Sequence, residues 1–67
     1  MRKWLKTKRN ERGYTMAQMA QMLDITESYY SLIEAGERQK KMDMMLAGKL
    51  SVIFGIPIEE IAMYERR

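Results

Sequence analysis

Lysine and arginine are concentrated in two short stretches of this 67-residue chain. Residues 1–12 contain six of them and one acid, and residues 36–41 contain three and one acid. The intervening residues 13–35 contain three acids and neither lysine nor arginine. Clustered positive charge is typical of a surface that binds phosphate groups, although two solvated faces of a globular protein give the same pattern. The charges therefore define a candidate phosphate-binding surface.

The residue types that are missing exclude several kinds of chemistry. The sequence has no cysteine and no histidine, which excludes disulfides, thiolate nucleophiles, Cys/His zinc sites and an imidazole base. We therefore expect no enzyme, no catalytic residue, no metal site and no cofactor. Apolar runs reach about five residues, whereas a membrane-spanning helix needs about 20. The absence of cysteine fits a reducing compartment, and we expect a cytoplasmic protein.

The spacing of the apolar residues predicts an all-α protein. A hydrophobic fraction of 46% and a charged fraction of 31% are typical of a folded domain, and the length suits a single domain over residues 1–67. Apolar residues recur with the helical period of about 3.6 residues, and no stretch alternates between apolar and polar residues for long enough to predict a strand. The sequence predicts five helices, at residues 2–12, 16–23, 27–35 and 44–54 and after Pro57, with a basic loop at residues 37–43.

Polar residues and glycine mark the expected ends of these helices. Thr15 and Gln18 form a capping-box pattern at the start of the second helix, and Thr26 can cap the third. Asp24 tolerates a positive φ in the turn between them, and Gly36 suits the end of the third helix. Two short helices joined by a three-residue turn form a helix-turn-helix unit.

The apolar positions predict which side of each helix faces the core. The first helix presents Leu5, Arg9 and Arg12 on one side, and an arginine within a core-facing stripe needs a partner. Trp4 is expected to pack against the C-terminal helices. The other residues expected to face inward are Met16, Met19, Ala20, Leu23, Tyr30, Ile33, Leu46, Leu50, Ile53, Phe54, Ile58, Ile61 and Ala62.

Two stretches within residues 5–61 carry a family resemblance, LKTKRNERGYTMAQMAQMLDITESYYSLIEAGER and KLSVIFGIPIEEI. They resemble the phage-repressor and Cro-like helix-turn-helix family of bacterial transcription regulators. The resemblance implies a compact five-helix bundle that binds DNA, like the DNA-binding domain of lambda repressor. It also implies that Arg9 pairs with Glu34 as a structural ion pair. The features in register are Arg9, Thr15, Met19-Ala20, Ile25, Ile33-Glu34, Gly36 and Phe54-Gly55-Ile56.

The chain departs from the family pattern at three places. The family usually has a glutamine after the opening threonine, where it touches a phosphate, and this chain has Met16. Asp24 stands at the turn position where the family usually has glycine. The basic loop is longer than usual and lacks the proline that is common there. These departures put one phosphate contact and the geometry of the loop in question.

The resemblance implies that the third helix reads base edges with residues near its start and on its outer face. The candidates are Glu27, Ser28, Tyr29 and Leu32. Glu27 could accept a hydrogen bond from cytosine, Ser28 could bond either base type, and Leu32 could contact a thymine methyl group. Tyr29 could reach a phosphate or a base. The alternative is that Glu27 only complements the helix dipole and Tyr29 is a surface aromatic, whereas Tyr30 is expected to pack inside.

A second group of residues is expected to contact the DNA backbone, namely Tyr14, Thr15, Gln18, Arg38, Lys40 and Lys41. The start of the second helix and the basic loop would then bind phosphates from two sides. The alternative for Thr15 is capping alone, and Lys40 and Lys41 could be ordinary solubilising charges. The N-terminal residues Arg2, Lys3, Lys6 and Lys8 have a weaker claim to DNA contact.

These residues together predict a sequence-specific double-stranded DNA-binding regulator. So small a domain offers few base contacts, so we expect a homodimer on an inverted-repeat operator. Family analogy suggests a repressor from a phage or mobile element that acts at the nucleoid. We expect no ligand-sensing domain, so control would come from the concentration of the protein or from a competing protein antagonist. The alternative is a protein-interaction module on the same fold, such as an antirepressor or an antitoxin. A dimer surface is expected at Met42, Met44, Ile58, Ile61 and Met63.

Overall fold

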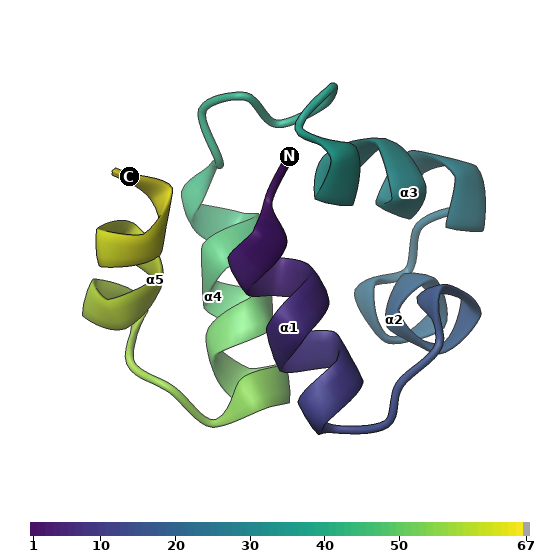
Figure 1. Ribbon diagram of the computed structural model, residues 1–67, viewed down its shortest axis with the longest axis horizontal. Coiled ribbons are helices and arrows are strands. Elements are labelled where there is room, and N and C mark those ends of the chain that lie inside the picture. Colours follow the sequence, from purple (N-terminus) through teal and green to yellow (C-terminus); the bar gives the residue numbers. More distant parts are fainter. Residues whose placement is uncertain (67) are drawn as a thin grey trace.

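The structure is a computed structural model that describes residues 1–66. These residues form α-helices and no strand, which confirms the predicted all-α class. Within the described range, no helix is both long and apolar enough to cross a bilayer. The helices are α1 (Lys3–Glu11), α2 (Met16–Leu23), α3 (Glu27–Ala35), α4 (Met44–Phe54) and α5 (Ile58–Glu65) (Figure 1).

Side-chain caps fix where α2, α3 and α4 begin. Thr15 and Gln18 form the predicted capping box at the start of α2, and the Thr26 hydroxyl accepts a hydrogen bond from the amide of Tyr29 in α3. Asp43 caps α4, because its carboxylate accepts a hydrogen bond from the Leu46 amide at 2.7 Å. The sequence alone predicts Asp43 as the last residue of the basic loop, without this capping role. Each cap satisfies an amide that has no partner inside the helix.

Left-handed residues fix where the same helices end. Asp24 has the predicted positive φ, 58°, at the end of α2, and this conformation allows the sharp turn into α3. Gly36 ends α3 with a φ of 82°, and Gly55 ends α4 with a φ of 65°. The short turn at Asp24 holds α2 and α3 as the helix-turn-helix pair.

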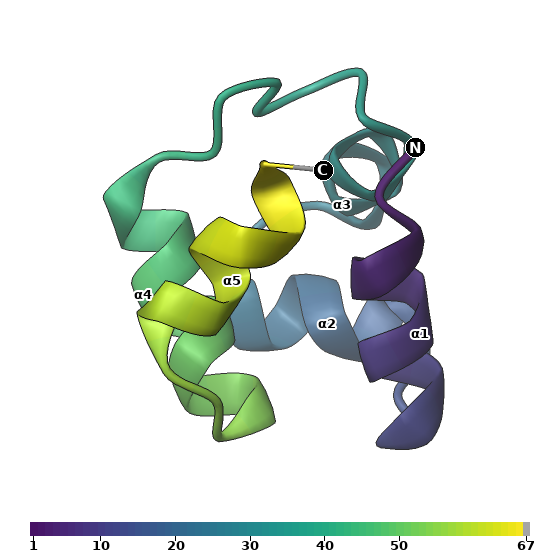
Figure 2. The same ribbon diagram turned by 60° about the vertical axis from the view of Figure 1, so that its left-hand side comes forward.

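The core lies where α1 meets the α2–α3 pair and the α4–α5 pair. Helix α1 packs against α3 and α2 packs against α4, and Figure 2 shows the basic loop running over one end of the bundle from α3 to α4. Ala20 is 3% exposed within the core, as expected where α2 packs against α3. The buried apolar residues are Leu5, Met19, Ala20, Leu23, Tyr30, Ile33, Leu46, Leu50, Phe54 and Ile61.

Several positions expected to face inward lie at the surface. Arg12 is exposed, and its guanidinium donates a hydrogen bond to the carbonyl of Phe54 at the end of α4. Ile58 is 41% exposed, and Ala62 is also exposed, because α5 buries mainly Ile61. A helix of eight residues at the edge of the bundle has room for only a narrow buried stripe.

Trp4 packs against α5, as predicted. Its ring stacks on that of Tyr64 with the ring centroids 5.2 Å apart. Its indole N–H donates a hydrogen bond to Glu65 Oε2 at 2.8 Å. These contacts tie the beginning of α1 to the last turn of the C-terminal helix.

Candidate nucleic-acid interface

Helix α3 buries one side and leaves the other free. Tyr30, Ile33 and Glu34 are its buried residues, whereas Glu27 and Ser28 in the first turn are exposed. Leu32, which is 37% exposed, lies further along the same helix and is also open to solvent. The cap at Thr26 fixes this orientation because it sets where the helix begins.

The exposed side of α3 borders a shallow hollow against the start of α2. Its lining residues are Met16, Glu27, Ser28, Ser31 and Leu32. The structure therefore brings together three of the four residues expected to read bases. Ser31 was not among them, although it follows Glu27 by four residues and Ser28 by three and so had to share their face. Met16, at the position of the missing glutamine, lies in the same hollow.

Tyr29 lies apart from this group. Its ring is half-buried and packs against the core, and its hydroxyl accepts a hydrogen bond from Gln39 Nε2 at 3.2 Å. The phenol is therefore directed to the basic loop. Tyr30, as expected, is fully buried.

The first turn of α2 is held by its capping box. The Thr15 hydroxyl accepts a hydrogen bond from the Gln18 amide at 3.1 Å, and Gln18 Oε1 accepts one from the Thr15 amide at 2.8 Å. Both residues are exposed, while Tyr14 is half-buried beside the core. Thr15 therefore caps α2 and is exposed to solvent at the same time, so its structural role does not prevent it from contacting a ligand.

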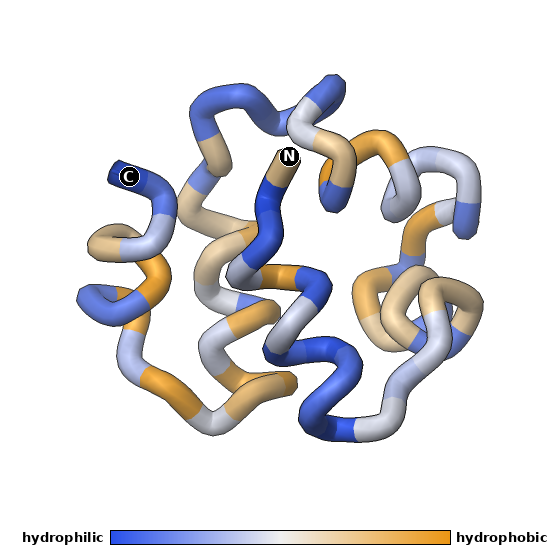
Figure 3. Tube along the Cα trace, in the orientation of Figure 1, coloured by the Kyte–Doolittle hydropathy of each residue, from blue (hydrophilic) through white to orange (hydrophobic). Residues whose placement is uncertain are grey.

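The basic loop carries its cationic side chains into solvent. Arg38, Lys40 and Lys41 are exposed, and Figure 3 shows the loop as a strongly hydrophilic segment over one end of the bundle. Gln39, between them, is half-buried and has a φ of 55°, which non-glycine residues rarely adopt. The loop thus has a defined backbone conformation, with Gln39 directed inward and the charged side chains directed into solvent.

A buried ionic network fixes α3 against α1. Arg9 Nε donates to Glu34 Oε2 at 3.0 Å, and Arg9 Nη2 donates to Glu34 Oε1 at 3.2 Å. The Tyr30 hydroxyl donates to Glu34 Oε2 at 2.8 Å. The hydrogen bond with Glu34 raises the pKa of Arg9, and burial followed by the bond to Glu34 raises the pKa of Tyr30. Arg9 is thereby engaged inside the protein and held away from the outer face of α3.

Residues 5–61 match the helix-turn-helix family, which accounts for the α2–α3 unit and the helices around it. The chain belongs to the Cro/C1-type helix-turn-helix family. Membership in this family indicates DNA binding in transcription regulation. The exposed side of α3 is accordingly the candidate recognition surface of a helix-turn-helix protein.

A relative from Bacillus subtilis (strain 168), YqaF, is described as an uncharacterized HTH-type transcriptional regulator. It is 46% identical over 39 residues, which are 58% of this chain and 51% of the relative. The match thus spans about half the length of the relative. No solved structure matches the chain.

Proposed function

We propose that this helix-turn-helix protein is a sequence-specific regulator that binds double-stranded DNA as a dimer on an inverted-repeat operator, where it acts as a repressor by occupying the site. The observation that carries the proposal is the free outer side of α3. Glu27, Ser28 and Leu32 lie together there, next to the first turn of α2 and on the helix that leads into the basic loop. A helix with one buried and one free side can enter the major groove without unpacking the core.

The side chains on this face suit base recognition. Glu27 would accept a hydrogen bond from cytosine N4, Ser28 would bond either base type, and Leu32 would contact a thymine methyl group. Ser31 extends the same polar edge. We assign Tyr29 to the support of the basic loop, since its hydroxyl is already bonded to Gln39.

The segments beside α3 suit contact with phosphates. Thr15 and Gln18 border the first turn of α2, where free backbone amides attract anions. Arg38, Lys40 and Lys41 supply positive charge from the loop that follows α3. Contacts on either side of the recognition helix would fix its register on the duplex.

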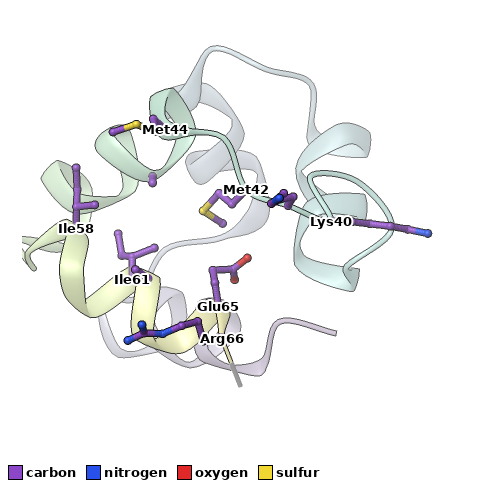
Figure 4. Close-up of a pocket in the computed structure, with 10 residues that line it drawn as sticks. Lys40, Met42, Met44, Ile58, Ile61, Glu65 and Arg66 are labelled. Carbon is purple, nitrogen blue, oxygen red and sulfur yellow. The ribbon is translucent and has the colours of Figure 1, made fainter.

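A groove between the basic loop, α4 and α5 supports the proposed dimer. Figure 4 shows Met42 from the loop, Met44 from α4, and Ile58 and Ile61 from α5 around it. Glu59 in the first turn of α5 and Arg66 directly after its end are also exposed. Antiparallel pairing of two α5 helices about a two-fold axis would bring Glu59 of one copy opposite Arg66 of the other, so the surface is self-complementary in charge. Met63, 50% exposed, lies near the centre of that pairing.

Selection of duplexes from a random-sequence pool tests the proposal. The purified protein is incubated with the pool at about 0.15 M salt, where purely electrostatic binding is weak. We expect enrichment of an inverted repeat with half-sites about 34 Å apart, one helical turn. Bound DNA without any enriched sequence would contradict sequence-specific binding.

The outer face of α4 gives weight to a protein-interaction module as a second candidate. Met44, Met45 and Val52 are 79%, 75% and 82% exposed, which leaves an apolar strip interrupted by the exposed Lys49. Such strips often mark contact with another protein. DNA affinity that does not depend on Glu27 and Ser28 would favour this second function.

A further inference from the structure

Arg2 makes an unusually complete set of contacts for a residue at the beginning of a chain. Its side chain is 7% exposed, and all five of its N–H donors have acceptors. Nε and Nη2 donate to the two carboxylate oxygens of Glu65, at 2.9 and 3.0 Å. The other three donors bind backbone carbonyls, of Ile33 at 2.7 Å, of Arg38 at 3.0 Å, and of Gln39.

The three carbonyls belong to the end of α3 and to the basic loop. The Ile33 carbonyl lies in the last turn of α3, where it also accepts a hydrogen bond from the Gly36 amide at 3.1 Å. Those of Arg38 and Gln39 lie in the loop that carries the exposed cations. The backbone amide of Arg2 also donates to the Glu34 carbonyl at 2.8 Å. One guanidinium therefore joins α3, the basic loop and α5.

Gln39 is held in this arrangement through both its backbone and its side chain. Its left-handed backbone costs free energy for a residue with a side chain. Its carbonyl is bound by Arg2, its side-chain amide donates to the Tyr29 hydroxyl at 3.2 Å, and its Oε1 accepts from the Asp43 amide at 3.0 Å. Three hydrogen bonds made by Gln39 thus fix the loop between Arg38 and Lys40.

We propose that Arg2 is a positioning residue for DNA binding: paired with Glu65, it holds the basic loop in one conformation so that Arg38, Lys40 and Lys41 meet the phosphates without first being ordered. The proposal rests on the proposed function. Arg2 is itself buried and fully bonded, so it acts through the loop and is no phosphate ligand. A loop that is ordered before binding loses less conformational entropy when it binds.

Lysine cannot replace arginine in this role. A lysine keeps the positive charge but offers three donors on a compact ammonium, whereas the planar guanidinium reaches a carboxylate and three carbonyls at once. Arg2→Lys therefore removes the positioning contacts while it leaves the net charge unchanged. A change in DNA affinity then cannot be ascribed to lost long-range attraction.

The test compares Arg2→Lys with Trp4→Phe, a matched control. Trp4→Phe removes the indole hydrogen bond to Glu65 and leaves every donor of Arg2 in place. The first measurement is the NMR order parameter of the amides of residues 38–41 in the free protein. We expect these to fall from about 0.85 to below about 0.6 in Arg2→Lys and to stay high in Trp4→Phe.

The second measurement is affinity for a duplex selected by the unmodified protein, over a range of salt. We expect Arg2→Lys to bind about tenfold more weakly with an unchanged salt slope, because the phosphate contacts still form once the loop is ordered by DNA. Unchanged DNA affinity in an Arg2→Lys variant whose loop has become disordered would overturn the proposal, because the order of the loop would then not matter for binding.

Glu65→Gln keeps the test decisive if Arg2→Lys does not fold. It removes the charge that orients the guanidinium, so we expect the same loop disorder in weaker form. Folded variants at Arg2 and Glu65 whose loop order equals that of the unmodified protein would overturn the proposal, as would an equal loss in Trp4→Phe. The order parameters need no DNA, so failure of the proposed function is distinguishable from failure of this one.

Discussion

Arg9 in α1 and Glu34 in α3 form a buried, two-pronged ion pair, with Nε and Oε2 3.0 Å apart. The pair joins the first helix to the helix that carries the candidate recognition surface. Glu34 also accepts a hydrogen bond from the Tyr30 hydroxyl, so both of its carboxylate oxygens are hydrogen-bonded inside the protein. The stability of the domain and the position of α3 therefore depend on the same three side chains.

Removal of Glu34 should reduce stability before it reduces DNA affinity. Glu34→Ala leaves the Arg9 guanidinium buried without its counter-charge, which typically costs about 3–5 kcal/mol. Thermal and urea denaturation measure this loss. Glu34→Gln, which keeps an acceptor, should lose less. A folded Glu34→Ala variant of normal stability but weak DNA binding would contradict the structural role.

Tyr30 should make the protein sensitive to alkaline pH. Burial and the bond to Glu34 raise its pKa in the folded state above the ordinary value of 10.0. Below pH 10 both states keep the proton, so the contribution is complete. Above that pH the unfolded state loses the proton first, and stability falls by about 1.4 kcal/mol per pH unit. The advantage over Tyr30→Phe should therefore shrink by about 1.4 kcal/mol between pH 9 and 11. A stability difference between the unmodified protein and Tyr30→Phe that stays constant from pH 9 to 11 would contradict this prediction.

Two glycine substitutions should change stability in opposite directions. Gly48 lies within α4, and a Cβ added there would meet open space. Gly48→Ala should stabilise the protein by about 0.5–1 kcal/mol, because alanine favours the helix. Gly55 has a φ of 65°, so Gly55→Ala should cost about 1 kcal/mol. Urea denaturation of both variants tests the pair, and two changes of the same sign would contradict the helix end at Gly55.

The basic loop should set the salt dependence of DNA binding. Lys40→Ala and Lys41→Ala each remove one expected phosphate contact, so each should lower the slope of log affinity against log salt by about 1. Base preference should not change. Titrations at several salt concentrations measure the slopes, and unchanged slopes would make these lysines simple solubilising charges.

The α5 surface should control self-association. Ile58 is 41% exposed, so Ile58→Asp should leave the fold intact while it weakens the dimer at least about tenfold. Val52→Asp places the same charge on the outer face of α4, where Val52 is 82% exposed, and serves as the control. Sedimentation equilibrium distinguishes the two. If Val52→Asp dissociates the dimer and Ile58→Asp does not, the interface lies on α4 and the prediction is wrong.

Local signals in the sequence predicted most of the fold. The capping box at Thr15, the left-handed turn at Asp24 and the glycine at position 36 each depend on a few neighbouring residues. Such signals are readable without knowledge of tertiary contacts. The outward group on α3 was expected from the family resemblance, and helical spacing places Ser31 beside Glu27 and Ser28.

Features that depend on distant contacts were not predictable in this way. Arg2 looked like one more N-terminal cation, because its acceptors lie 31 to 63 residues away in the chain. Arg12 shares a helical face with Leu5 and Arg9, yet it lies beyond the edge of the core and bonds to the end of α4. The inward assignment of Ile58 and Ala62 failed because periodicity gives the side of a helix but not the width that its neighbours cover.

The central claim is that the outer side of α3 reads DNA sequence. The most direct measurement is selection from a random duplex pool with Ser28→Ala, Leu32→Ala and, as the control, Lys41→Ala. We predict that each α3 variant changes base preference at its own position of the half-site, with discrimination reduced by about 1–3 kcal/mol. Lys41→Ala should retain the original preference at lower affinity. The same preferred sequence from both α3 variants and the unmodified protein would contradict the claim.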